Sequence, residues 1–275
     1  MSTADVSGKS LAELVSLRGR RAVVTGGARG LGKAIAARLA EAGADLLIGD
    51  LDEEQATAAA KELAERHGVH AIGAAMDVTD AAAVAAAADR AVAELGGLEI
   101  WVNNAGIFPA VPLLEMTEET WDQVFAVNAR GVFVGAREAA RRMSAPRGGS
   151  DRGGVIVNIV STAGFRGSAP GLAAYVGSKH AVRGLTRELA LELAPLGIRV
   201  LGVAPSFVPT EGNLAMAAAA GVNLDEIPPT DLMLNSPIGR IGTPDDIARV
   251  ALFCASDLSA FMTGSTLLAD GGDTA

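Results

Sequence analysis

The chain has 275 residues, of which 49% are hydrophobic, so it is long enough for one large α/β domain with a substantial core. Its formal net charge of -9 argues against nucleic acid and against anionic membranes as partners. A single cysteine, Cys254, excludes an internal disulfide; its apolar neighbours predict a buried structural thiol, and the composition fits a reducing, cytoplasmic setting.

The first residues carry no strong structural signal. Residues 1–18 mix small and polar side chains, and we expect a loosely ordered extension ahead of a single domain that spans 19–275. No basic stretch followed by an apolar run opens the chain, which argues against a secretory signal. No apolar run approaches membrane-spanning length, so no membrane partner is expected.

A strand, a glycine turn and a helix follow in direct succession. Residues 21–25 form a short apolar run, the next seven residues are rich in glycine, and 33–42 have helical periodicity up to Gly43. Such a turn lets a phosphate approach the free N–H groups of a helix N-terminus. The candidate cofactor residues of this turn are Gly26, Arg29, Gly30, Leu31 and Gly32.

Two kinds of nucleotide site compete for this turn. Residues 27–33 also match the G-x-x-x-x-G-K of a P-loop, but Ala34 stands where a P-loop needs Ser or Thr for Mg²⁺. The next apolar run, 44–50, ends at Asp50, where a dinucleotide fold places the acid that binds the adenosine ribose. We therefore favour a dinucleotide site; the alternative role for Asp50 is to cap helix 53–67.

The alternation of strands and helices continues to the end of the chain. We expect strands at 70–76, 98–103, 155–160, 198–204 and 266–269, and helices at 80–95, 118–143, 174–194 and 244–256. Several strands are continuously apolar, which predicts a parallel sheet covered by helices on both faces. Such a doubly wound sheet binds ligands at the carboxyl ends of its strands, where the polar residues gather.

The only tyrosine of the chain, Tyr175, lies four residues before Lys179 in the expected helix 174–194. Residues at i and i+4 share a helix face, so the ammonium group can lie beside the phenol and lower its pKa. The pair could then exchange protons near neutral pH. Taken alone, the pair also fits an ordinary solvated helix face.

The ordered set of motifs resembles the short-chain dehydrogenase/reductase family, in its single-domain branch. The resemblance covers 20–272 and rests on Thr25-Gly-x-x-x-Gly-x-Gly32, Asn103-Asn-Ala-Gly106, Asn128, Ser161, Tyr175-x-x-x-Lys179 and Pro205. It implies a Rossmann-type, seven-stranded sheet in the order 3-2-1-4-5-6-7. It also implies an NAD(H)-dependent oxidoreductase that interconverts a secondary alcohol and a ketone by hydride transfer from the pro-S face.

The resemblance also assigns roles to individual residues. Tyr175 would be the acid/base group, Ser161 would bind the substrate oxygen, Lys179 would bind the nicotinamide ribose, and Asn128 would hold a water that passes protons. Without the resemblance, Asn128 reads as a helix amide bonded to its own backbone. Further cofactor contacts would come from Leu51, Asp77, Val78, Asn104, Ala105, Gly106, Pro205, Val208 and Thr210.

Two features depart from the usual family pattern. Ser206 replaces the glycine that commonly follows Pro205, which narrows the space near the nicotinamide, and the interval from Ser161 to Tyr175 is one residue longer than the commonest form. For the coenzyme, Asp50 favours NAD, because its carboxylate would repel the 2′-phosphate of NADP. Arg29 points the other way, and we expect Asp50 to dominate.

A substrate lid is expected at 206–236. Its apolar residues favour a small, hydrophobic alcohol or ketone, although they could equally pack the lid onto its own domain. They are Phe207, Leu214, Met216, Leu224, Ile227, Leu232, Met233 and Leu234. Arg166 could meet an acidic substrate, but a surface role is the simpler interpretation. The three histidines form no metal-ligand pattern, so no metal is expected.

Two other functions remain open, and one assembly is expected. The chain could be a cofactor-binding regulator or scaffold whose catalysis has lapsed, or a dehydratase or epimerase that uses the cofactor transiently. The intact Ser161, Tyr175 and Lys179 argue against the first, and the short C-terminal region argues against the second. We expect a homotetramer in which helices 118–143 and 174–194 pair through alanine-rich faces formed by Ala136, Ala139, Ala140, Ala190 and Ala194.

Overall fold

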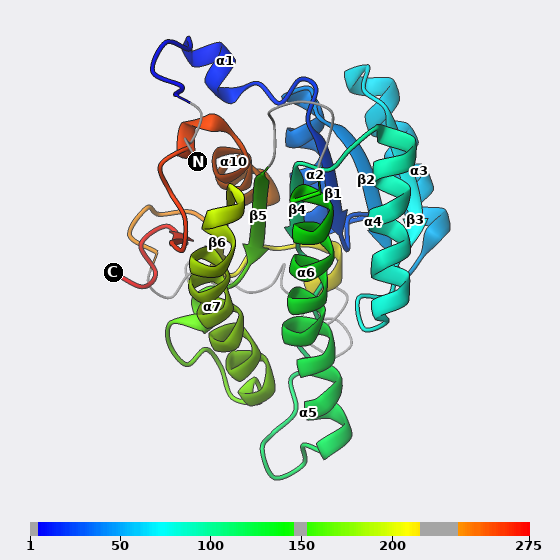
Figure 1. Ribbon diagram of the computed structural model, residues 1–275. Helices are drawn as coiled ribbons and strands as arrows, with labels where there is room; N and C mark the ends of the chain where they lie inside the picture. Colours follow the sequence, from blue (N-terminus) through cyan, green and yellow to red (C-terminus); the bar gives the residue numbers. More distant parts are fainter. Residues whose placement is uncertain (1–4, 146–152, 215–235) are drawn as a thin grey trace.

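Seven parallel strands form the centre of the molecule in the computed structural model, which describes residues 5–145, 153–214 and 236–275 (Figure 1). Their order is β3-β2-β1-β4-β5-β6-β7, as the resemblance implied. Strands are therefore added to one side of β1 up to β3 and to the other side from β4 onward. This change of side between β1 and β4 leaves a crevice at their carboxyl ends. The strands are β1 (Arg21–Thr25), β2 (Asp45–Asp50), β3 (Ala71–Ala75), β4 (Ile100–Asn103), β5 (Gly154–Ile159), β6 (Ile198–Pro205) and β7 (Thr266–Ala269).

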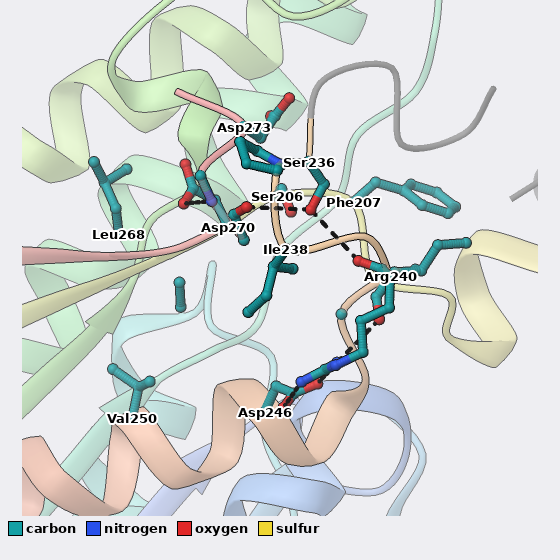
Figure 2. Close-up of a pocket in the computed structure, with 16 residues that line it drawn as sticks. Ser206, Phe207, Ser236, Ile238, Arg240, Asp246, Val250, Leu268, Asp270 and Asp273 are labelled. Carbon is teal, nitrogen blue, oxygen red and sulfur yellow. Dashed lines mark hydrogen bonds and ion pairs between the residues drawn. The ribbon is translucent and has the colours of Figure 1, made fainter. Parts of the chain in front are cut away.

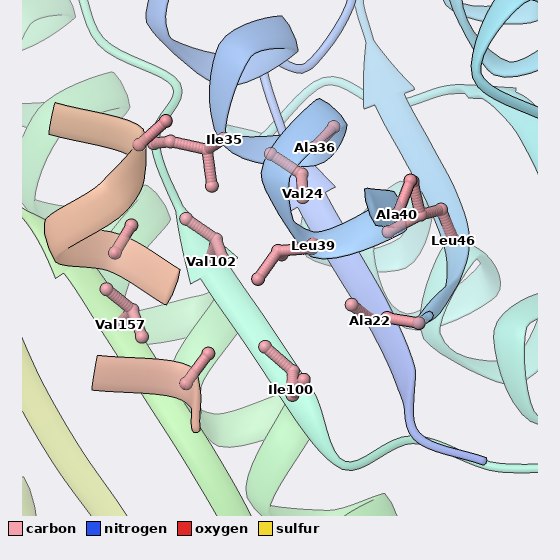
Figure 3. Packing of buried hydrophobic residues seen from close by; sticks show 14 of the residues in the cluster. Ala22, Val24, Ile35, Ala36, Leu39, Ala40, Leu46, Ile100, Val102 and Val157 are labelled. Atoms are coloured by element: carbon pink, nitrogen blue, oxygen red, sulfur yellow. The ribbon is translucent and has the colours of Figure 1, made fainter. Parts of the chain in front are cut away.

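Helices cover both faces of this sheet. One face carries α2 (Gly30–Glu41), α3 (Glu53–His67) and α10 (Pro244–Ala255), and the other carries α4 (Ala81–Leu95), α6 (Gly131–Met143) and α7 (Ala173–Leu193). Successive strand residues point to the two faces in turn: Val24 packs under α2 (Figure 3), and Val23 belongs to the core on the opposite face of the sheet. This double burial explains why the strands are continuously apolar. None of the helices within the described ranges is long and apolar enough to cross a bilayer.

The helix expected at 118–143 contains an interruption. It divides into α5 (Glu118–Phe125), a π-helical turn (Ala126–Arg130) and α6. A π-turn adds a residue to one turn of the helix and is frequent at functional sites. Asn128 lies in this turn and is fully buried. The single unbroken helix predicted from the sequence for 118–143 was wrong at this point, and the interruption contains the candidate site residue Asn128.

The N-terminal extension is better ordered than expected. Ser10 and Glu13 form a capping box at the start of α1 (Leu11–Val15), and Lys9 forms an ion pair with Asp257 at 2.7 Å. Leu17 is fully buried in the core, and its N–H donates to the carbonyl of Ala42. Burial of one leucine is worth roughly 1.5–3 kcal/mol, enough to hold this segment in place. The expectation of a loose extension was therefore wrong for 10–17; residues 1–4 lie outside the described ranges.

Candidate active site

The glycine turn folds tightly over the N-terminus of α2. Gly26 and Gly30 have positive φ angles of 62° and 55°. At Gly32, a Cβ atom would lie 2.1 Å from the carbonyl oxygen of Gly26, so only glycine allows the backbone to approach this closely. Arg29, the N-cap residue, makes no side-chain cap hydrogen bond. The first N–H groups of α2 thus face the crevice as a site for an anion.

A second loop, after β4, is fixed directly against the glycine turn. The Thr25 hydroxyl accepts hydrogen bonds from the N–H groups of Asn104 and Ala105, both at 3.0 Å. The Asn104 amide donates to the carbonyls of Thr25 and Gly26 at 3.0 and 2.9 Å. Asn104 and Ala105, two of the predicted cofactor residues, therefore hold the cradle in shape. Thr25 was quoted only as the start of a motif, and its buried hydroxyl is a positioning group that sequence reasoning missed.

Asp50 lies at the carboxyl end of β2, and its carboxylate accepts from the N–H of Ala28 at 3.1 Å. Helix α3 is capped by Asp52 instead, which accepts from the N–H of Gln55 at 3.0 Å. The alternative role for Asp50, as a helix cap, was therefore wrong. Hydrogen bonds from Gln55 lower the pKa of Asp52, and the exposed Arg29 adds a smaller electrostatic effect in the same direction. Arg29 thus lies near Asp52 at the rim.

Three further predicted residues lie at the same edge of the sheet. Leu51 directly follows Asp50 and is 76% exposed, which is unusual for a leucine and leaves it free to contact a flat apolar group. Asp77 and Val78 follow the neighbouring strand β3; Val78 is buried, and the Asp77 carboxylate accepts from the Thr79 N–H at 2.8 Å. Because β2 and β3 are parallel neighbours, these residues form one border of the crevice.

Tyr175 and Lys179 lie one turn apart on α7, as predicted. The Lys179 side chain is buried, and its ammonium donates to the carbonyl of Ile159, at the end of β5, at 2.8 Å. The ammonium nitrogen is 5.6 Å from the centroid of the Tyr175 ring. Phe108 packs edge-on against the same ring, with centroids 5.8 Å apart. The phenol is therefore held between an apolar wall and a buried charge.

Burial dominates the proton affinities of this pair. It raises the pKa of Tyr175, and a hydrogen bond with Ser161 acts against that rise. Burial also lowers the pKa of Lys179 to about 8. The ammonium donates to the Ile159 carbonyl and not to the phenol, and the lowering of the phenol pKa by Lys179 stays a prediction. Despite the longer interval between them, Ser161 lies close enough to Tyr175 to affect the pKa of the phenol.

Asn128 joins three parts of the site. Its amide accepts from the N–H of Ile107 at 2.8 Å and donates to the Ile107 carbonyl at 2.7 Å. It also donates to the Ser178 hydroxyl at 3.1 Å, and that hydroxyl donates to the Tyr175 carbonyl at 2.7 Å. The reading of Asn128 as an amide bonded to its own helix was wrong. Ser178 was missed, since a serine inside a helix gives no signal of its own.

The loop after β6 closes the crevice from the other side. Val208 is buried, and the Asn213 amide donates to its carbonyl at 2.6 Å. A Cβ at Gly30 would lie 3.4 Å from Thr210, so this loop reaches the glycine turn. Gly106 lies near the Asn128 amide and the Lys179 ammonium, at 3.3 and 3.8 Å from a Cβ placed there. The predicted cofactor residues after β1, β2, β3, β4 and β6 are thus brought to one edge.

Beside this loop lies a hollow of about 650 Å³ (Figure 2). It is bordered by Ser206 and Phe207 after Pro205, by residues within 236–242, and by 268–273, which comprise the end of β7 and the residues that follow it. Ser206, the departure from the family pattern, therefore faces open space. Of the expected lid, 215–235 lies outside the described ranges.

The described residues hold no group of three or more potential metal ligands. Cys254 is buried, as predicted, and burial raises the pKa of its thiol to about 12. A thiol of this kind is a poor nucleophile at neutral pH. The candidate chemistry therefore rests on Tyr175, Lys179 and Ser161.

The crevice fits a dinucleotide cofactor. A close-packed glycine cradle faces the N-terminus of α2, a carboxylate stands at the end of β2, and a buried ammonium stands across the crevice on α7. The glycine cradle suits the pyrophosphate of such a cofactor, the carboxylate suits the adenosine ribose, and the ammonium suits the nicotinamide ribose.

Comparisons with known proteins agree with this geometry. A family model described as enoyl-(acyl carrier protein) reductase matches residues 26–274. The 4-formylbenzenesulfonate dehydrogenase of Comamonas testosteroni is 41% identical over 259 residues, covering 94% of this chain and 99% of that enzyme. The D-threitol dehydrogenase of Mycolicibacterium smegmatis is 39% identical and covers 94% of each chain. The structure of a gluconate 5-dehydrogenase from Burkholderia cenocepacia, in complex with NADP and tartrate, matches with a TM-score of 0.85 at 37% identity, covering 96% and 99%.

We predict that replacing Lys179 with methionine stabilises the free protein at neutral pH. The native pKa of about 8 lies below the ordinary value of 10.5, so the unfolded chain binds more protons between these values and wild-type stability rises with pH across that window. The buried charge therefore destabilises the native state most below pH 8, by at most about 3 kcal/mol. Urea unfolding should give Lys179→Met an advantage of roughly 1–3 kcal/mol at pH 7.

That advantage should shrink as the pH rises from about 8 toward 10.5. The control is Lys61→Met, whose side chain is exposed. A wild type more stable than Lys179→Met at pH 7 would show that the ammonium is not desolvated as described.

Proposed function

The chain belongs to the short-chain dehydrogenase/reductase family, as its motifs predicted, and on that premise we propose that it is an NAD(H)-dependent enzyme interconverting a secondary alcohol and a ketone. The family consists of oxidoreductases that use a nicotinamide cofactor. One observation carries the proposal: a phenol whose pKa is lowered by the Ser161 side chain lies beside the buried Lys179 ammonium, at the strand edge that bears the glycine cradle.

In the proposed reaction, the cofactor supplies or accepts the hydride. Tyr175 donates its phenolic proton to the carbonyl oxygen during reduction and takes a proton from the alcohol during oxidation. Ser161, which lies close enough to the phenol to affect its pKa, donates to the same oxygen and orients the substrate. The Lys179 ammonium stabilises the phenolate that forms, because a positive charge favours a nearby anion most strongly where water is excluded.

Proton exchange with solvent would run through Lys179. A group with a pKa of about 8 is charged at neutral pH but can give up its proton readily, which a lysine with a pKa of 10.5 cannot do as easily. Asn128 lies close by, across Gly106, and its amide is oriented by Ile107 and Ser178. We assign Asn128 the role of holding a water molecule in this path.

The cofactor would be held by the residues predicted for it. The N–H groups at Arg29, Gly30 and Leu31 would bind the pyrophosphate, Asp50 the adenosine ribose, and Lys179 the nicotinamide ribose. Leu51, Asp77 and Val78 would border the adenine. Asn104, Ala105 and Gly106 would line the floor of the crevice, while Pro205, Val208 and Thr210 would border the nicotinamide.

NAD is the proposed coenzyme because of where Asp50 and Arg29 lie. The Asp50 carboxylate accepts from Ala28 at the glycine turn, while Arg29 is exposed and close enough to Asp52 to influence its pKa. Because the Asp52 carboxylate partly balances the Arg29 charge, Arg29 attracts a 2′-phosphate less strongly. NADP is present in the related gluconate 5-dehydrogenase, so this is the finer point that needs an experiment.

An apolar substrate is proposed from the walls of the site. Phe108 packs on Tyr175, and the N–H of Val111 donates to the carbonyl of Gly171 at 3.0 Å, which joins the loops after β4 and β5. Phe108 thus brings an apolar side chain against the reacting group. A catalytically lapsed regulator or scaffold remains the alternative, disfavoured by the complete Ser161, Tyr175 and Lys179 set.

The first prediction concerns turnover. Purified protein should reduce ketones or oxidise secondary alcohols from a broad panel, followed by nicotinamide absorbance. Tyr175→Phe should lower kcat by roughly 10²–10⁴-fold, because it deletes the proton donor but keeps the ring that packs on Phe108. Cofactor affinity should stay near wild type. Wild type inactive on the whole panel, with cofactor still bound, would favour the scaffold.

The second prediction concerns the coenzyme. The kcat/KM of wild type should favour NAD over NADP by roughly 30- to 150-fold, which corresponds to about 2–3 kcal/mol of repulsion between Asp50 and a 2′-phosphate. Asp50→Ala should raise the relative efficiency with NADP, and Arg29→Ala in that background should lower it again. Equal use of the two coenzymes by wild type would show that Asp50 does not face the ribose.

A homotetramer is also proposed, but the faces expected to pair need correction. Ala136, Ala139, Ala140 and Ala190 are buried in the chain's own core, so they are not available to a partner. The outward face of α7 is formed instead by Gly184, Arg187, Glu188 and Leu191, all exposed. On α6 the exposed Phe133 lies under the Arg137 guanidinium, 5.3 Å from its ring centroid.

The third prediction uses a glycine on that face. A Cβ at Gly184 would meet nothing within 4 Å, so a larger residue there is compatible with the folded chain. A glycine inside a helix lowers helix stability by about 1 kcal/mol relative to alanine. Close approach of a second helix would explain why a glycine stands at this position. Light scattering should show an oligomer for wild type and Gly184→Ala, and a smaller species for Gly184→Arg. A monomeric wild type at micromolar concentration would refute the assembly.

A further inference from the structure

The C-terminal residues after β7 border the hollow beside the loop that follows β6. The Asp270 carboxylate accepts from the N–H groups of Gly272 and Thr274, both at 3.0 Å, and folds this tail back on itself. The Gly271 carbonyl accepts from the Ser236 hydroxyl at 3.2 Å. Asp270 to Asp273 together form one wall of the hollow that Ser206 and Phe207 border (Figure 2).

An ion pair links this tail to the loop that carries Ser161. The Arg166 guanidinium and the Asp273 carboxylate are 2.5 Å apart, with the two side chains 46% and 19% exposed. Arg166 lies five residues after Ser161, and its N–H donates to the carbonyl of Thr162. A Cβ at the neighbouring Gly164 would lie 2.8 Å from the Lys179 carbonyl, so this loop packs on the Tyr175 helix. The ion pair therefore spans from the Ser161 loop to the wall of the hollow.

Other cations near the hollow and the Ser161 loop are also engaged. At the hollow, Arg240 pairs with Asp246 at 2.6 Å. At the Ser161 loop, the Arg183 guanidinium donates to the Gly164 carbonyl and lies 3.8 Å from the centroid of the Phe165 ring. Within the described part of the chain, an anionic substrate entering here would thus find Arg166 already neutralised by Asp273. Burying or crowding a second carboxylate beside an existing pair is unfavourable, because the like charge is not compensated.

We infer that Asp273 is a specificity-determining residue, which neutralises Arg166 and restricts the enzyme to substrates that are uncharged at the end remote from the reacting carbonyl. The inference rests on the proposed function. Removal of the Asp273 charge would release a guanidinium, which binds carboxylates through two parallel hydrogen bonds. Relatives of this fold are named for both kinds of compound: the formylbenzenesulfonate and gluconate dehydrogenases for anions, and the D-threitol dehydrogenase for an uncharged polyol.

The experiment uses two ketones that differ in charge and little in shape: 4-oxocyclohexanecarboxylate and 4-oxocyclohexanecarboxamide. Their kcat/KM values, or their inhibition constants against the best ketone of the panel, give a ratio of amide to acid. Wild type should prefer the amide. Asp273→Asn should shift the ratio toward the acid by roughly five- to tenfold. Arg166 is half exposed, so this effect lies between those of a buried and a fully exposed ion pair.

The double variant Asp273→Asn, Arg166→Gln should return the ratio to that of wild type. Glu94→Gln, which breaks the Arg90–Glu94 pair on α4, is the matched control and should leave the ratio unchanged. An unchanged ratio in Asp273→Asn, in an enzyme that turns over other ketones, overturns this inference alone. Wild type inactive on all ketones overturns the proposed function and the inference with it.

Discussion

The burial of the Lys179 ammonium is the constraint on which the rest of the site depends. A charge taken out of water needs compensation, and here the carbonyl of Ile159 supplies it from the end of β5. This bond joins α7 to the end of β5. Because Tyr175 is one turn away on the same face of α7, the phenol lies at the same edge of the sheet.

The polar groups around Lys179 follow from that placement. Gly106 lets the loop after β4 pass close to the ammonium, and the π-turn directs Asn128 inward to bind both hydrogen-bonding groups of Ile107. Ser178 then connects Asn128 to the Tyr175 helix. The buried Lys179 charge lowers the stability of the cofactor-free protein, so the residue best suited to the site is not the one that would make the protein most stable.

Sequence patterns were sufficient for the alternation of strands and helices and for the edge at which the functional residues gather, whereas the sheet order came from the family resemblance. The continuously apolar strands and the glycine turn have local causes, so periodicity and turn chemistry reveal them. The π-turn at Asn128 was not visible, because one extra residue in a helix leaves its apolar pattern almost unchanged. Ser178, Thr25 and Asp273 were missed for a different reason: each acts through a partner distant in the sequence, and single residues of these types carry no periodic signal.

The measurement that tests the central claim most directly is the fate of deuterium from a secondary alcohol labelled at its carbinol carbon. Oxidation by the wild-type enzyme should place the deuterium on C4 of the reduced nicotinamide, on the pro-S face, with none lost to solvent; proton NMR of the isolated NADH reports both. Reduced coenzyme without deuterium would contradict direct hydride transfer. Deuterium on the pro-R face would contradict the placement of the substrate on the pro-S face, beside Tyr175 and Lys179.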